Sequence, residues 1–228
     1  MSKHLQRDIE QIRKDLLSQF GLVEKLVDDA VRTLVEGRLD LTESVIKADQ
    51  AVDEREVLIE EHCLKTLALH QPVAVDLRWI ATVVKINADL ERIADLACNI
   101  TERAQELHQY ANFPIPDQVP RMVRSAMTMM KKALDAFVDL DGNLAREVIR
   151  LDNEVDQLNK EAITELTGLM KLHPDNVEPA LHCFSAARHI ERVADHAENI
   201  AEEVIYIVEG EIVRHRHGDL SSELPLRQ

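Results

Sequence analysis

The sequence of 228 residues carries 27 lysines and arginines against 42 aspartates and glutamates, a formal net charge of −15 at pH 7. This balance argues against nucleic acid or anionic lipid as a direct partner, because both require a basic face, and favours cations or basic protein surfaces. Hydrophobic residues make up 45% of the chain and aromatic residues only 3%, with six glycines and seven prolines. An aliphatic core with few chain breakers favours packed helices over a sandwich or barrel.

The first half of the chain reads as three helices. Apolar residues recur three and four apart from residue 5 to residue 34, which predicts a helix ending at Gly37. Gly21 lies inside it at a cost of ~1 kcal/mol relative to alanine, so we expect a close helix contact or a slight kink there. A second helix follows to about Leu69, where Pro72 breaks the pattern. A third helix is predicted over residues 73–109, and its lone Trp79 is expected to pack in the core or at an interface.

A linker then separates the two halves. Residues 111–120 hold three prolines in seven positions, which a helix interior does not tolerate. The second half repeats the plan, with helices predicted over about 119–140, 144–172 and 179–209 and a proline break after His173. We therefore predict an all-α protein of two tandem three-helix bundles, residues 1–112 and residues 113–228, the second with a polar C-terminal tail. The tail holds His215 and His217, which we expect to be solvated rather than metal-bound.

The halves are related by an internal repeat. Residues 90–100 read LERIADLACNI and residues 190–200 read IERVADHAENI, with seven of the eleven positions identical. A second match, at an offset of 103, relates residues 45–53 on the second helix to residues 148–156 on the fifth. Each half therefore carries one acidic i,i+4 pair on its second helix and one on its third. The pairs are Asp49/Asp53, Glu91/Asp95, Asp152/Asp156 and Glu191/Asp195.

These pairs are the candidate functional residues. Residues four apart share one helix face. The acids of the third and sixth helices lie opposite the apolar stripe, and we expect them to form an outward row together with Glu102, Glu198 and Glu202. The acids of the second and fifth helices flank the stripe and lie nearer a seam. Whether the two sets converge on one site depends on the rotation of each helix, which the sequence leaves open.

Two interpretations of the acids compete. A solvated acidic face is one, in which Arg92 pairs with Asp95, Arg188 with Glu191 and Lys160 with Asp156. Like charges at i,i+4 cost ~0.2–0.5 kcal/mol each, however, and four repeat-related pairs suggest that a cation offsets the repulsion. Carboxylates suit magnesium, manganese and iron, so metal binding is favoured.

At this point the sequence resembles the PhoU family, over nearly its whole length. The resemblance is carried by residues 71–78 (QPVAVDLR), by residues 90–95 with Asn99, and by residues 190–195 with Asn199. It implies two three-helix bundles whose Glu/Asp-x-x-x-Asp pairs hold multinuclear iron or zinc clusters on the bundle surface, or bind magnesium or manganese. The metal ligands expected on this basis are Asp49, Asp53, Glu91, Asp95, Asn99, Asp152, Asp156, Glu191, Asp195 and Asn199.

The resemblance also implies regulation rather than catalysis. PhoU proteins restrain phosphate uptake and the phosphate-starvation response, acting in the cytoplasm between the ATPase of the phosphate transporter and a sensor histidine kinase. A homodimer is expected from the family. This chain departs from an exact repeat where Asn87 corresponds to Ala187 and where Cys98 corresponds to Glu198. The two sites are therefore expected to differ in metal or affinity.

Other function classes have less support. A ferritin-like enzyme or iron store needs inward-facing Glu-x-x-His motifs, and no glutamate here has a histidine three residues on. The sequence has no glycine-rich phosphate loop and no Gly-x-Ser-x-Gly elbow, so no catalytic residue is predicted. His189 and His196 flank the second motif and are expected to pack rather than to bind metal. A metal-free helical adaptor remains the open alternative.

The sequence also predicts the compartment. No apolar run approaches the ~18 residues of a membrane span, and the first sixteen residues, MSKHLQRDIEQIRKDL, contain no apolar signal region. Cys63, Cys98 and Cys183 are scattered and belong to no motif, which fits a reducing environment. We expect a cytoplasmic protein with no direct membrane insertion.

Overall fold

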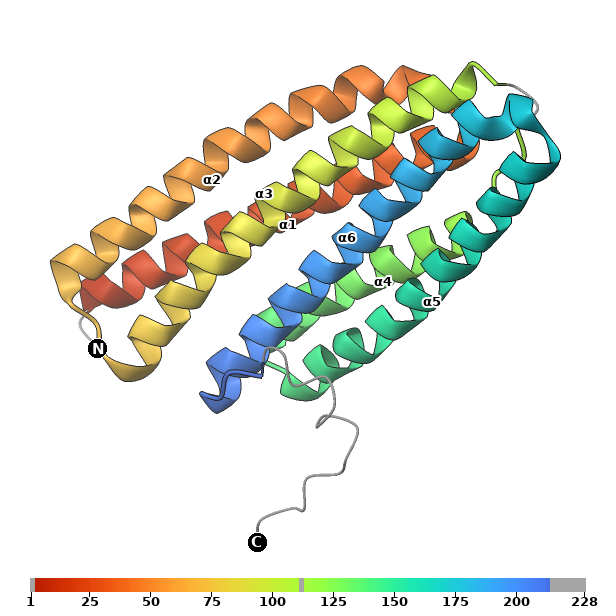
Figure 1. Cartoon of the computed structure of the whole chain (residues 1–228). Helices are drawn as coiled ribbons and strands as arrows, with labels where there is room; N and C mark the ends of the chain where they lie inside the picture. The colour runs from red at the N-terminus through yellow and green to blue at the C-terminus, as the bar shows by residue number, and fades with distance from the viewer. Residues whose placement is uncertain (1–2, 111–112, 214–228) are drawn as a thin grey trace, which may run out of the picture.

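The computed structural model describes residues 3–110 and 113–213, and these form an all-α fold without strands. Two three-helix bundles lie side by side, one built from α1–α3 and the other from α4–α6 (Figure 1). The helices are α1 (Lys3–Glu36), α2 (Thr42–His70), α3 (Ala74–His108), α4 (Gln118–Asp139), α5 (Gly142–Leu172) and α6 (Val177–Glu209). Short 3₁₀ turns, Leu39–Leu41 and Pro174–Asn176, precede α2 and α6.

The helix ends follow from local sequence. Gly37, with φ +68°, ends α1 in the left-handed conformation that glycine adopts without steric cost. The end of α2 is closed by Gln71, whose N–H donates to the Leu67 carbonyl at 3.0 Å before Pro72 stops the helix. The side chain of Asp141 caps α5 by accepting hydrogen bonds from the backbone N–H groups of Asn143 and Leu144.

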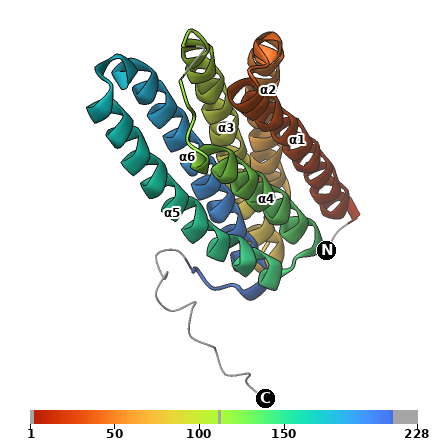
Figure 2. The same ribbon diagram turned by 90° about the vertical axis from the view of Figure 1, so that its right-hand side faces the viewer.

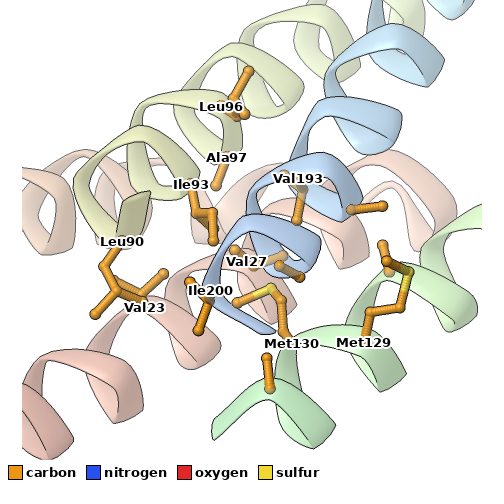
Figure 3. Close-up of a cluster of buried hydrophobic side chains, with 14 of the residues drawn as sticks. Val23, Val27, Leu90, Ile93, Leu96, Ala97, Met129, Met130, Val193 and Ile200 are labelled. Carbon is orange, nitrogen blue, oxygen red and sulfur yellow. The ribbon is translucent and has the colours of Figure 1, made fainter. Parts of the chain in front are cut away.

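The apolar stripes of all six helices meet in one continuous core that crosses both bundles. Figure 3 shows its centre, where Val23 and Val27 of α1 and Leu90 and Ile93 of α3 lie near side chains from α4 and α6. Trp79 is buried and stacks on Phe137 of α4 at a centroid distance of 6.4 Å. The expectation that Trp79 packs in the core or at an interface is confirmed.

Antiparallel α3 and α6 form the junction between the bundles (Figures 1 and 2). Besides apolar packing, polar contacts cross this junction, among them two between charged or ionisable groups. Lys85 Nζ lies 3.2 Å from Glu203 Oε1, and His196 Nδ1 lies 2.8 Å from Asp89 Oδ1. The pairing of His196 with the other bundle agrees with a packing role for this histidine.

Two expectations need correction. Gly21 marks no close helix contact, because it is exposed and a Cβ atom there would meet no heavy atom within 4 Å. The linker is shorter than predicted, because α4 already begins at Gln118 and includes Pro120 in its first turn. Proline is tolerated there because the N–H groups of the first turn make no hydrogen bond within the helix. Residues 111–112 and the pair His215/His217 lie outside the described residues, and the domain limits at 112 and 113 stay a prediction.

Gly21 provides a test of the fold. Replacing Gly21 with alanine should raise the free energy of unfolding by roughly 0.5–1 kcal/mol, because the site is helical and sterically open. Gly37→Ala is the matched control and should lower it by about 1 kcal/mol, because that residue needs a positive φ. Urea denaturation followed by circular dichroism measures both. A destabilising Gly21→Ala would mean that the α1 surface is covered in solution.

Candidate metal centre

The first bundle brings the acids of α2 and α3 together. Asp49 and Asp53 on α2 face Glu91 and Asp95 on α3, and we call these four residues the first acidic row. Burial raises the pKa of Asp49, and the charges of Asp53 and Asp95 raise it further, against a lowering hydrogen bond from Cys98. Burial likewise raises the pKa of Glu91, followed by repulsion from Asp95 and, across the seam, from Asp53.

The second bundle repeats the arrangement between α5 and α6. Asp152, Asp156, Glu191 and Asp195 form the second acidic row. Burial raises the pKa of Glu191, and repulsion from Asp195 and Asp156 adds to it. The pKa of Asp195 is raised by burial and then by Asp156. In both bundles, then, the acids of the two helices lie near enough across the seam to raise one another's pKa.

Four further residues join the rows, of which Cys98 and Glu198 were already singled out by the sequence whereas Glu56 and Asn159 were not. Glu56 and Asn159 lie seven residues after the first acid of α2 and α5, while Cys98 and Glu198 lie seven residues after the first acid of α3 and α6. Positions i, i+4 and i+7 share one helix face, so this heptad spacing was the signal that could have identified them. Asn159 Nδ2 donates to Glu191 Oε1 at 3.3 Å, which ties α5 to α6 within the second row.

Several side-chain oxygens in or beside the rows have no hydrogen-bond partner. Asp49 Oδ1, Asn87 Oδ1, Asn159 Oδ1 and Glu191 Oε2 are all buried and unpaired. Asn87 lies one turn before Glu91 and uses its Nδ2 to hold the Glu56 carbonyl at 2.8 Å. Leaving such an atom unpaired costs roughly 1–3 kcal/mol. Carboxylate and amide oxygens without donors are suitable ligands for a hard cation, so the residues fit a divalent metal.

The side chains are nevertheless not preassembled around an ion. Within residues 3–110 and 113–213, no three carboxylate, thiol or imidazole groups converge closely enough to hold a metal as they stand. Instead, exposed cations form ion pairs with some acids of the two rows, as the sequence predicted. Arg92 lies 3.4 Å from Asp95, Arg188 lies 2.8 Å from Glu191, and Lys160 lies 3.6 Å from Asp156. The pairs of Asp95 and Asp156 are exposed and therefore weak, whereas Glu191 is only 12% exposed.

The other predicted ligands occupy different positions. Asn99 donates to the Asp95 carbonyl of its own helix at 2.8 Å, and Asn199 donates to Asp89 of α3 at 3.4 Å. The prediction that Glu202 lies in an outward row is wrong, since only 7% of it is exposed. Its burial follows from the position of α6, which packs against α3, α4 and α5 and has little free surface. The equivalent Glu102 is exposed, as predicted.

The two rows differ at the end nearest Asp49 and Asp152. In the first bundle the Cys98 thiol lies beside Asp49, and burial together with that charge raises the pKa of Cys98 to about 12. In the second bundle Glu198 takes the same place. Burial, followed by repulsion from Asp152 and Glu202, raises the pKa of Glu198 to about 8. The repeat therefore offers a sulfur atom in one row and an additional carboxylate in the other.

Comparison with known proteins decides the family. The PhoU domain matches the chain twice, at residues 16–104 and 119–204. The chain belongs to the PhoU family. Among curated PhoU relatives, the phosphate-specific transport system accessory protein PhoU homolog of Pseudomonas putida is 40% identical, covering 94% of this chain and 84% of the relative. The Escherichia coli accessory protein PhoU is 32% identical, with coverages of 96% and 92%.

Solved PhoU structures share the fold. The crystal structure of PhoU from Pseudomonas aeruginosa superimposes with a TM-score of 0.87 at 38% identity, over 90% of this chain and 99% of that one. The phosphate transport system regulatory protein PhoU from Streptococcus pneumoniae gives 0.85 at 26% identity, over 92% and 99%. Two tandem PhoU domains thus account for the predicted architecture. None of the described helices combines the length and apolar composition that a bilayer crossing requires.

Glu198 gives the second row a measurable pH dependence. Its folded-state pKa of about 8 exceeds the ordinary value of 4.5, so the folded state binds more protons and loses stability as pH rises from about 4.5 to about 8. In metal-free protein, Glu198→Gln should therefore raise the melting temperature more at pH 8 than at pH 5. Glu102→Gln, at the exposed position, is the control. Equal effects at both pH values would show that Glu198 is ionised throughout.

Proposed function

We propose that this chain regulates phosphate uptake and the phosphate-starvation response. The support is the pair of PhoU domains together with relatives, matched over most of both chains, that are named as accessory proteins of the phosphate-specific transport system. In this proposal the protein works in the cytoplasm, between the transporter ATPase and the sensor histidine kinase, as a negative regulator that ultimately changes transcription. It performs no catalysis of its own, and it assembles as a homodimer.

The acidic rows are proposed to bind divalent metal and so to set the charge of the docking surface. When bound, a metal such as iron, zinc, manganese or magnesium would supply positive charge to carboxylates that burial and mutual repulsion destabilise. The ligands would be Asp49, Asp53, Glu91 and Asp95 in the first row and their counterparts in the second. Without metal, the same surface would attract basic patches on a partner.

The competing functions have less support. An iron-oxidising enzyme or store would hold its carboxylates inside a four-helix bundle, whereas here they lie at seams between helix pairs of three-helix bundles. A metal-free adaptor would use the same helices without the ions.

Complementation tests the regulatory proposal. In a bacterium deprived of its own PhoU protein, this chain should restore low phosphate uptake and a silent phosphate-starvation reporter in phosphate-rich medium. Combined substitution of both rows (Asp53→Asn, Glu91→Gln, Asp156→Asn and Glu191→Gln) should relieve the repression. Asp28→Asn, which removes one exposed charge of α1, is the control and should act as wild type.

The outcomes are distinct. Failure of the wild-type chain to repress, although it is folded and expressed, would contradict the regulatory role. Full repression by the combined variant would keep the regulatory role but favour the metal-free adaptor.

Cobalt(II) tests the difference between the rows. Added to metal-free protein, it should produce an intense thiolate-to-metal absorption in the near ultraviolet, because Cys98 lies at the end of the first row beside Asp49. Binding must displace the thiol proton, so the absorption should increase with pH. Cys98→Ser should abolish the band, Cys63→Ser should keep it, and Glu198→Cys should add a second site. Cobalt binding with only weak d–d bands would show that the row holds metal through oxygen alone.

A further inference from the structure

A group of unpaired cations lies on the outer surface of the second bundle. Arg121, Arg124 and Lys131 project from α4, and Arg150 projects from α5. All four are exposed, and within the described part of the chain none of these side chains has an ion pair, a hydrogen bond or an aromatic contact. Many other cations of this acidic protein, among them Arg32, do have carboxylate partners.

Two of these arginines line a groove between α4 and α5. The groove has a volume of about 290 Å³, with Arg121, Arg124, Ser125 and Thr128 on one wall. On the α5 side are Leu151 and Glu154. The Thr128 hydroxyl donates to the Arg124 carbonyl at 2.7 Å and keeps its lone pairs, while both guanidinium groups keep all their donors. The groove therefore offers several strong donors and one carboxylate.

The fold itself does not require these residues. Shifting the α4 numbers back by 103 places buried Val119, Ala126 and Ala133 on buried Leu16, Val23 and Ala30 of α1, so the two helices are equivalent. In that register the groove residues Arg121, Arg124, Ser125 and Thr128 correspond to Ser18, Gly21, Leu22 and Lys25. The first bundle therefore lacks both arginines. Since the arginines are exposed and unpaired, packing does not explain their presence in the second.

We propose that the α4–α5 groove binds inorganic phosphate in its protonated, hydrogen phosphate form. Arginine forks match tetrahedral oxyanions with bidentate, charge-assisted hydrogen bonds, and Ser125 adds a hydroxyl. Glu154 determines which oxyanion is accepted. A carboxylate repels a fully ionised anion, whereas it accepts a hydrogen bond from an anion that still carries a proton. Hydrogen phosphate has such a proton at neutral pH and sulfate does not, so the groove discriminates through a repulsive element.

Glu154 also distinguishes free phosphate from a phosphate ester. A phosphomonoester has a second pKa of about 6 and so has lost its remaining proton at pH 7.5. It therefore has no phosphate O–H left to donate a hydrogen bond to the Glu154 carboxylate. The inference does not depend on metal in the acidic rows, because the groove uses neither row. If the groove does not bind phosphate, the regulatory proposal is unaffected. If the chain does not regulate phosphate uptake, phosphate binding in the groove is still decided by direct titration.

Titration followed by two-dimensional ¹H–¹⁵N NMR tests the assignment, on the full chain at pH 7.5 and constant ionic strength. Inorganic phosphate should give saturable shifts confined to the first half of α4 and the facing part of α5. Sulfate and a simple phosphomonoester such as glycerol 3-phosphate should bind at least several-fold more weakly. Arg121→Gln and Arg124→Gln should each weaken phosphate binding roughly tenfold, the loss expected for one charge-assisted hydrogen-bond pair. Lys25→Gln, which changes a cation of the first bundle at the position equivalent to Thr128, should change nothing.

Glu154→Gln supplies the decisive comparison. The variant should bind sulfate and the phosphomonoester about as well as phosphate, because the repulsion that rejects them is gone. Absence of saturable phosphate shifts in folded wild-type protein would overturn the proposal. Equal affinity of the wild-type groove for sulfate and phosphate would also overturn it, since the arginines would then act as a non-selective anion surface.

Discussion

The contact between α3 and α6 is the interaction on which the rest of the molecule depends. Each of these helices carries one copy of the eleven-residue motif, and each copy serves two surfaces at once. Ile93 and Ala97 are fully buried in the shared core, while Glu91 and Asp95 face α2 at the seam. Small buried residues such as Ala194 and Ala197 let α6 pack closely against its neighbours. A rotation of α3 that improved one surface would disturb the other, so packing and site geometry are fixed together.

The electrostatic consequence is a fold that keeps like charges close together, most of them partly buried. Burial is the largest cause of the raised pKa at Asp49, Glu91, Glu191 and Asp195, and the neighbouring carboxylates add to it. The same acids could have been placed on exposed helix faces with less penalty. A positively charged ligand, whether a metal or a basic partner surface, would relieve the penalty, so the arrangement is better suited to binding than to stability.

Much of this architecture was predictable because it depends on periodicity. Six helices, their breaks at Gly37 and Pro72, and the packing of Trp79 all follow from patterns within a few residues in the chain. Convergence of the acids was not predictable, because it depends on how α2 is rotated against α3, and many rotations keep the same apolar stripe inward. The burial of Glu202 escaped prediction for a related reason, since a helical wheel assumes one buried face and α6 packs against three neighbours.

Glu56 and Asn159 could have been assigned to the rows from their spacing in the sequence. Both follow an acidic pair at the seven-residue spacing that places side chains on one face, and only the facing helix reveals their importance. At Gly21, by contrast, the sequence suggested a structural role that the structure does not show. A glycine inside a helix suggests a steric reason, yet here the space around it is open, so its presence has no packing explanation.

Helix α5 is shared by both proposed ligand sites, which raises the question of coupling. Asp152 and Asp156 face α6, whereas Leu151 and Glu154 line the groove with α4. Metal on one side and phosphate on the other would attract each other, and any coupling would be reciprocal. The diameter of a helix is about 10 Å, however, and the screening length at physiological salt is about 8 Å. Through-space attraction is therefore weak, so strong coupling would require that each ligand shift α5 itself, the one element that contacts both.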